Sequence, residues 1–422
     1  ASLHQLVEGL RQLGQVRGLG DAAQAAGAAA SVLRWGRRTG QDLLDAHLSD
    51  PLLKAILSAQ SGDHGLPPSQ VSVFFHAGVT HHYLNGGYYP LGGGFAIPRA
   101  FTRALRRAGG DLRLKTPVAR ILLEGNRAVG VQLADGSQIS ARNVISNADP
   151  EVTFGKLIGR EHVSDRLRRK LDRVRYSVSA LSLFFAVDMD LRAAGLDSGN
   201  YWMYDHADLN ELYRFSQTGG FLAPGSSAPP PALFLTATTL KDPSKMHSGH
   251  HTCEAFVFVN YDTFRQWAGE TSGEHSAEYN GLKEDLSWRI FRALDRRVPG
   301  LSQRVVFWSL GTPLTNEHYI NATRGNLYGI EKTPDQIGPL GFSTQSEFEN
   351  LLLCGASTLS HGVAGATATG LSAARAILRC PTAELLTQNG PPLAIYPSED
   401  PAQWPPHLQE RIARGGRREE GA

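Results

Sequence analysis

Cysteine is scarce in this 422-residue chain, which contains three. Cys253, Cys354 and Cys380 are widely separated, so the sequence contains neither a CxxC redox pair nor the ligand spacing of a zinc knuckle. This scarcity makes a disulfide framework implausible and fits a reducing, intracellular compartment. It also argues against an oxidoreductase that works through cysteine thiols.

The chain also has little excess charge of either sign. Its 42 basic and 40 acidic residues leave a net charge of +2. This balance provides no basic footprint for nucleic acid, so we expect no nucleic-acid partner. Apolar runs such as residues 181–187 have the length of a strand and are too short to span a bilayer. No signal peptide is visible, and we expect an intracellular protein, cytoplasmic or peripheral to a membrane, with the organelle left open.

Metal-binding patterns and an obvious acid–base pair are missing too. His81-His82 and His250-His251 are adjacent pairs, and neighbouring side chains of an extended segment point to opposite sides. Since no cysteine or carboxylate pattern accompanies them, we predict no metal site. The one weak candidate for a catalytic residue is His361, which can donate a hydrogen bond to a ligand or simply be a loop residue.

What the chain does contain is a glycine-rich stretch, GASTLSHGVAGATATG, at residues 355–370. It lies between an apolar run at 351–354 and a helix-like segment at 371–378. A buried strand, a glycine-rich turn and a helix start of small residues together let backbone N–H groups approach a planar or anionic ligand, because glycine lacks the Cβ atom that would block it. The pattern indicates the closing piece of a cofactor domain. A tight turn without a ligand is the alternative.

Elsewhere the hydrophobic spacing predicts helices and short strands in alternation. We expect helices over most of residues 1–80, including the Ala-rich stretch 22–30, and a further helix from 97 to 108 that ends at Gly109-Gly110. Residues 111–123 predict a strand, a proline break and a second strand, and a strand at 129–133 is followed by a hairpin turn at Asp135-Gly136. The remaining predictions are strands near 139, 144–145, 180–187, 233–238 and 255–259 and helices at 166–174 and 284–294.

Several sequence motifs follow one another in an order that identifies a family resemblance. They are YYPLGGG at 88–94, KTPVARI at 115–121, VISNADP at 144–150, GTPLTNEHYINATRGNLYG at 311–329 and the glycine-rich stretch. In this order they resemble the FAD-dependent carotenoid and retinoid oxidoreductases: phytoene desaturases, carotenoid isomerases and retinol saturases. The spacing is most similar to the retinol saturase and carotenoid isomerase-like branch, which includes a pyridine nucleotide-disulfide oxidoreductase domain protein. The resemblance covers residues 83–378.

The resemblance implies a mixed α/β (α+β) fold, a Rossmann-like FAD-binding flavoprotein of the amine oxidase and phytoene desaturase type. That family opens with a strand, GxGxxG and a helix, whereas GLGDAA at 18–23 follows no buried strand. We therefore expect the N-terminal dinucleotide half to be absent and residue 1 to lie inside the full-length fold. The expected parts are a helical part of the substrate domain at 1–82, FAD-domain segments at 83–150 and 326–378, the substrate domain at 151–325 and a tail at 379–422 that is poorly ordered at its end.

The resemblance also implies cofactor-binding positions. Val118 would lie beside the adenine, and Asn147, Ala148 and Asp149 near the pyrophosphate and the first glycine loop. Gly355 and Ala356 would approach the ribityl and phosphate groups, and Gly362, Val363 and Ala364 would run under the flavin ring at a helix N-terminus. Gly92, Gly93 and Gly94 would form a loop at the junction of flavin and substrate. Each position has a structural alternative: a core strand for Val118, a turn or cap for Asp149 and a shaped loop for Gly92 to Gly94.

The function implied by the resemblance is hydride transfer between FAD and an apolar polyene or isoprenoid lipid. Aromatic residues Tyr83, Tyr88, Tyr89, Tyr201, Trp202 and Tyr204 are candidates for an apolar tunnel, with ordinary core packing as the alternative. NAD(P) or a quinone remains open as electron partner, peripheral membrane contact fits such a substrate, and the oligomeric state is left open. The competing hypotheses are a non-catalytic binding module and an amine-oxidase-like flavoenzyme.

Overall fold

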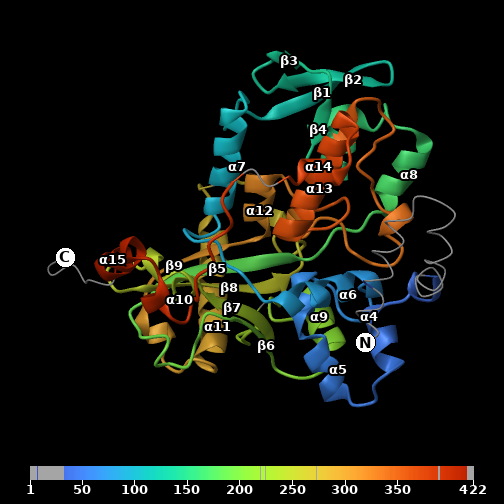
Figure 1. Ribbon diagram of the computed structural model, residues 1–422. Coiled ribbons are helices and arrows are strands. Elements are labelled where there is room, and N and C mark those ends of the chain that lie inside the picture. The colour runs from blue at the N-terminus through green and yellow to red at the C-terminus, as the bar shows by residue number, and fades with distance from the viewer. Residues whose placement is uncertain are drawn as a thin grey trace.

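The computed structural model describes residue 7 and residues 33–218, 220–223, 225–271, 273–387 and 390–415. Within these ranges the chain forms helices around three separate sheets (Figure 1). The helices are α4 Gly40–Asp45, α5 Pro51–Leu57, α6 Val73–His82, α7 Ala96–Arg107, α8 Asp165–Arg173, α9 Leu209–Gln217, α10 Thr238–Lys241, α11 Ala277–Asp295, α12 Pro313–Ile320, α13 Gly362–Leu378, α14 Thr382–Leu385 and α15 Pro406–Gly415. The strands are β1 Val118–Glu124, β2 Arg127–Leu133, β3 Gln138–Ser140, β4 Val144–Ser146, β5 Ser179–Val187, β6 Asn200–Tyr204, β7 Ala232–Ala237, β8 His251–Val259, β9 Val305–Gly311 and β10 Leu351–Leu353.

The largest sheet is antiparallel and has the strand order β6-β7-β8-β5-β9. Side chains alternate across its strands, so each face has its own set of residues. Leu181, Leu183 and Phe185 of β5 pack with α11 in the main hydrophobic core, where the rings of Phe185 and Phe291 meet edge to face at 5.4 Å. The opposite face carries aromatic side chains and is described with the site.

A two-stranded parallel sheet joins segments that are far apart in the sequence. β4 pairs with β10 in register, Leu351 opposite Val144 and Leu353 opposite Ser146. Behind it, Phe154 and Ile158 of the π-helix η3 (Glu151–Gly159) pack in a second hydrophobic core with the buried residues of β10. This pairing positions the glycine-rich stretch, which follows β10 directly.

A third sheet, β1-β2-β3, is an antiparallel meander at one end of the molecule (Figure 1). Its β2–β3 turn lies at Asp135-Gly136, where Gly136 has φ +86, which confirms the predicted hairpin. Helix α7 is confirmed as well. The strand predicted before the proline break is wrong: residues 111–117 form no strand, because Lys115 has a left-handed φ of +53 and Pro117 restricts Thr116, so pairing starts only at Val118.

The N-terminal stretch and the end of the C-terminal tail are the two ends of the chain at which the described residues stop. The Ala-rich stretch 22–30, the GLGDAA segment and the last residues of the tail, 416–422, lie outside the described residues. Before that end, the tail packs on the large-sheet domain through Trp404 and Leu408, which are buried. None of the helices in the described ranges is long and apolar enough to cross a membrane.

Candidate functional site

The glycine-rich stretch becomes a loop of residues 354–361 and the first turn of α13. The helix begins at Gly362, where φ is +75, and its N-cap residue His361 makes no side-chain capping bond. Gly362, Val363 and Ala364 are exposed, Val363 to 66%. The first N–H groups of an α-helix have no partner within the helix, and the helix dipole is positive at this end. The first backbone N–H groups of α13 therefore form an exposed, uncapped set of hydrogen-bond donors beyond the loop that follows the buried strand β10.

Gly355 lets this loop approach the end of β4 closely. Its φ is +89, and a Cβ atom built there would lie 2.0 Å from Asn147 Oδ1. The Gly355 N–H donates to Thr369 Oγ1 of α13 at 2.7 Å, and the Cys354 N–H donates to Ser146 O at 3.0 Å. The predicted positions 147 and 355 are thus brought together, and the close contact that glycine permits here is with Asn147.

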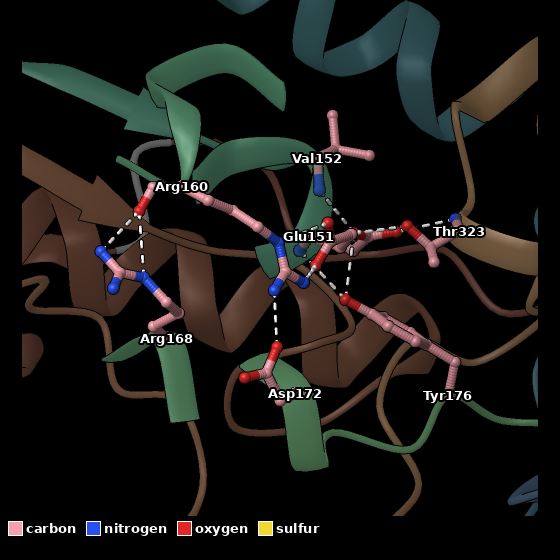
Figure 2. A network of polar contacts seen from close by, with 8 residues as sticks. Glu151, Val152, Arg160, Arg168, Asp172, Tyr176 and Thr323 are labelled. Carbon is pink, nitrogen blue, oxygen red and sulfur yellow. Dashed lines mark hydrogen bonds and ion pairs between the residues drawn. The ribbon is translucent and has the colours of Figure 1, made fainter. Parts of the chain in front are cut away.

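The Asp149 carboxylate ties three separate parts of the chain together through Val152, Tyr176 and Thr323, the partners that Figure 2 labels. Its Oδ1 accepts from the Val152 N–H at 3.0 Å, from Tyr176 OH at 3.2 Å and from Thr323 Oγ1 at 2.9 Å, while its Oδ2 accepts from the Thr323 N–H at 2.8 Å. Beside it, Arg160 contacts Glu151. The carboxylate is engaged with protein donors, so the cap predicted as its alternative role is present. Its place near a pyrophosphate stays a prediction, as does that of Ala148, whose carbonyl accepts from Thr153.

Two predicted positions lie on other elements. Val118 begins β1, on a different sheet from β4 and β10, and is 38% exposed. The loop of Gly92, Gly93 and Gly94 is fixed to the large-sheet domain, because the Gly92 N–H donates to Asp242 Oδ2 at 2.6 Å next to α10. The local contacts of Val118 and of Gly92 to Gly94 give no further support for cofactor binding, and their cofactor roles remain predictions.

His361 is buried behind the α13 N-terminus. Its Nε2 lies 2.8 Å from Asp63 O, and since a carbonyl only accepts, Nε2 carries the proton. Its ring stacks on Tyr328 at 4.5 Å and packs against Phe75 at 5.0 Å. The other nitrogen, Nδ1, is buried without a partner. The pKa of His361 is lowered to about 4, mainly by burial: the bond to Asp63 O opposes this shift, and the charge of Lys332 adds to it.

Two more histidines and a lysine surround this ring. His64 Nε2 and His76 Nδ1 are 3.4 Å apart, and burial lowers the pKa of both imidazoles. Lys332 is 2% exposed and donates from Nζ to Ala356 O at 2.8 Å, and burial lowers its pKa to about 8. Buried polar atoms without partners are rare in folded proteins, yet several occur here: Ser58 Oγ, Ser61 Oγ, Ser72 Oγ, His64 Nδ1, His76 Nε2 and His361 Nδ1.

The second face of the large sheet is aromatic. Trp202 stacks with Tyr204 at 6.4 Å and contacts Phe234 at 5.0 Å and Phe256 at 5.3 Å. The cavity beside these rings has a volume of only about 10 Å³. Of the predicted tunnel residues, Trp202 and Tyr204 are brought together. Tyr201 lies on the other face, where its OH donates to Asp197, while Tyr83 bonds to Asp63 and Tyr88 is 72% exposed.

No sequence pattern indicated that Lys332, Phe75 and Asp63 belong to this site. Lys332 lies in the polar run EKTPDQ, which has the composition of an exposed turn, and no periodicity marks it. Asp63 contributes its backbone carbonyl, for which a sequence carries no residue-specific signal. Tyr328 lay within the NLYG segment of the family resemblance, but nothing there indicated its stacking on His361.

The residues after β10 fit a flavin cofactor. The uncapped first turn of α13 offers N–H donors to an anionic group, and the unpartnered His361 Nδ1 lies directly before it. The profile of the family described as flavin containing amine oxidoreductase matches residues 21–378, which is most of the chain.

Individual relatives agree with this match. The chain is 29% identical over 358 residues to an all-trans-retinol 13,14-reductase of Danio rerio, covering 82% of this chain and 59% of that protein. It is 29% identical over 266 residues to a chloroplastic prolycopene isomerase of Arabidopsis thaliana, covering 62% and 40%. The chain thus spans less than two thirds of the length of these relatives.

The fold has a solved counterpart in the crystal structure of an oxidoreductase from Methanosarcina mazei. The TM-score is 0.56 at 16% identity, over 85% of this chain and 73% of that one. The predicted resemblance to carotenoid and retinoid oxidoreductases and the predicted fold class are confirmed. On the family match and the shared fold, the chain belongs to the flavin containing amine oxidoreductase family.

Proposed function

We propose that this chain takes part in FAD-dependent oxidation or reduction of an apolar polyene or isoprenoid lipid. The observation that carries the proposal is the exposed, uncapped N-terminus of α13, which a short loop connects to the buried strand β10. Family membership supports FAD as the ligand, and the names of the retinol and prolycopene relatives support the substrate class. NAD(P) or a quinone is the proposed class of electron partner.

The chain's own residues would bind and orient this cofactor. Gly362, Val363 and Ala364 would direct backbone N–H groups at its negative charge, and Gly355 and Ala356 would line its polar chain. Bound FAD supplies hydride acceptance and donation. His361 holds the loop before α13 by its bond to Asp63 O and its stacking on Tyr328, which keeps the first turn in place.

An apolar substrate has no charged group to bind, so recognition would depend on apolar surface. The aromatic face of Trp202, Phe234 and Phe256 is the surface proposed for it. Because the cavity there is small, the rings would have to move apart to admit a polyene. The proposal includes an intracellular location, cytoplasmic or peripheral to a membrane. Contact with a membrane fits this substrate class, because such substrates are dissolved in lipid.

The first test is an absorbance spectrum of the purified chain after incubation with FAD and desalting. A flavin spectrum at close to one flavin per protein supports the proposal. The reduced protein is then mixed anaerobically with all-trans-retinol or prolycopene, and flavin reoxidation and products are measured. In a separate sample the oxidised protein is mixed anaerobically with putrescine, and flavin reduction is measured. Loss of all flavin on desalting refutes an enzymatic role for this chain and favours the binding-module hypothesis. Reaction with putrescine alone favours the amine-oxidase hypothesis.

A further inference from the structure

Lys332 is a buried positive charge without a negative partner. It is 2% exposed, and its Nζ donates to a single protein acceptor at hydrogen-bond distance in the described structure, Ala356 O. Its own carbonyl accepts from the Ser72 N–H at 2.8 Å, so the segment before α6 covers it. The neighbouring Glu331 pairs instead with Arg175.

Other buried charges in the described part of the chain are compensated. Arg289 pairs with Asp285 and also donates to Phe221 O. Asp242 accepts from the N–H groups of Gly92 and Ser244. Removing an ion from water costs several kcal/mol unless an opposite charge or several hydrogen bonds replace the water. Lys332, with one neutral carbonyl, lacks this compensation.

The surroundings of Lys332 add positive rather than negative potential. Its charge is close enough to His361 to help lower the pKa of that imidazole. His361 is the N-cap of α13, so the positive end of the helix dipole lies in the same region. Ala356, which accepts from Lys332, belongs to the loop that leads to this helix. The Lys332 ammonium group and the positive end of α13 therefore lie in one region, and an anion bound there would compensate both.

We propose that the Lys332 ammonium is the countercharge for negative charge carried by bound FAD at the β10–α13 loop. This inference rests on the proposed function, since a polyene itself brings no charge. The negative charge has two sources in the cofactor, its diphosphate and its reduced ring. The same electrostatic attraction to Lys332 would apply to either source, and the test below distinguishes them.

The test compares Lys332→Met with the wild type and with two controls. Met has a similar length and no charge. Lys332→Arg keeps the charge. Lys170→Met is the matched control: Lys170 lies on α8, is partly buried and, like Lys332, donates to a backbone carbonyl, that of Gly341. FAD affinity is measured by fluorescence titration, and the two-electron midpoint potential by dye equilibration under argon.

Loss of one charge-assisted contact corresponds to a change in affinity of roughly tenfold or more. If the diphosphate is the source, Lys332→Met weakens oxidised FAD about tenfold and leaves the potential unchanged. If the reduced ring is the source, oxidised FAD binds as before, and reduced FAD about tenfold more weakly, so the potential falls by about 30 mV. Lys332→Arg, which keeps the charge, should retain most of the wild-type FAD affinity and midpoint potential. Unchanged affinity and potential in Lys332→Met, or an equal change in Lys170→Met, overturns the inference.

The unfolding free energy of the FAD-free protein separates this role from a structural one. Replacing an uncompensated buried charge by an apolar side chain should leave it unchanged or raise it. If Lys332→Met is instead much less stable than wild type without FAD, Lys332 is a structural residue and the inference is wrong. Failure of the wild type to bind FAD refutes the proposed function and the inference with it. Equal affinity for oxidised FAD together with an equal midpoint potential in wild type and Lys332→Met refutes only the inference.

Discussion

Asp149 offers the sharpest test of how this fold is held together. Its carboxylate accepts four hydrogen bonds, from Val152, Tyr176 and, twice, Thr323. The bond to the Thr323 N–H connects positions 174 residues apart in sequence. Asp149→Ala removes all four acceptor contacts and leaves the N–H groups of Val152 and Thr323 without their acceptor.

The expected loss follows from the contacts. Hydrogen bonds to a charged group contribute about 1.5 kcal/mol or more each, but Asp149 is only partly buried, so water replaces some of them. We expect Asp149→Ala to lower the free energy of unfolding by about 3 kcal/mol. Asp149→Asn keeps an oxygen for three of the donors and loses the bond from the Thr323 N–H, so about 1 kcal/mol is expected.

The assay is equilibrium unfolding in urea, followed by far-UV circular dichroism and tryptophan fluorescence. Asp165→Ala is the control: this aspartate pairs with Arg168 on the surface and its side chain is 77% exposed, so a change below about 1 kcal/mol is expected. A loss for Asp149→Ala no larger than that of the control would refute the reasoning, because the network would then contribute no net stability.

Three further predictions concern the loop before α13 and its first turn. Gly355→Ala should lower the free energy of unfolding by about 2 kcal/mol or more, because Gly355 has φ +89 and a Cβ atom there would clash with Asn147. Thermal unfolding measures this loss, and adding Asn147→Gly to the same chain should recover part of it. Because the pKa of His361 is lowered to about 4, its neutral form contributes stability that is complete above pH 6.5 and is lost as the pH falls through 4. Urea titrations should therefore show stability falling by about 3 kcal/mol more in the wild type than in His361→Phe between pH 7 and 4, and parallel curves would contradict the burial argument. Val363→Asp should leave the exposed start of α13 folded, since a carboxylate is favourable at a helix N-terminus. The same change should weaken FAD binding in a fluorescence titration, and an unchanged affinity would exclude this turn from the site.

Elements with strong local patterns could be predicted from the sequence. The alternation in β5 and β8, the spacing of α11 and the Asp135-Gly136 turn each have a physical cause within a few residues. The strand expected at 111–117 failed, because a strand needs a partner and pairing of β1 with β2 ends at Val118.

The site was predictable only in part for a related reason. Family resemblance placed the helix start at Gly362, and the structure agrees. The burial of Lys332 depends on the segment before α6, and the engagement of Asp149 depends on Thr323. Contacts between segments that are distant in sequence leave no periodicity in either one, so local reasoning could not find them.

The pairing of β4 with β10 has a consequence for biosynthesis. Roughly 200 residues separate Ser146 from Leu351, and ribosomes add about 5–20 residues per second. For about 10 to 40 s after β4 is made, its partner strand does not yet exist. During that interval its hydrogen-bonding edge is open to other chains in a polysome, so slower translation of residues 147–350 should increase co-translational aggregation or chaperone capture of the nascent protein.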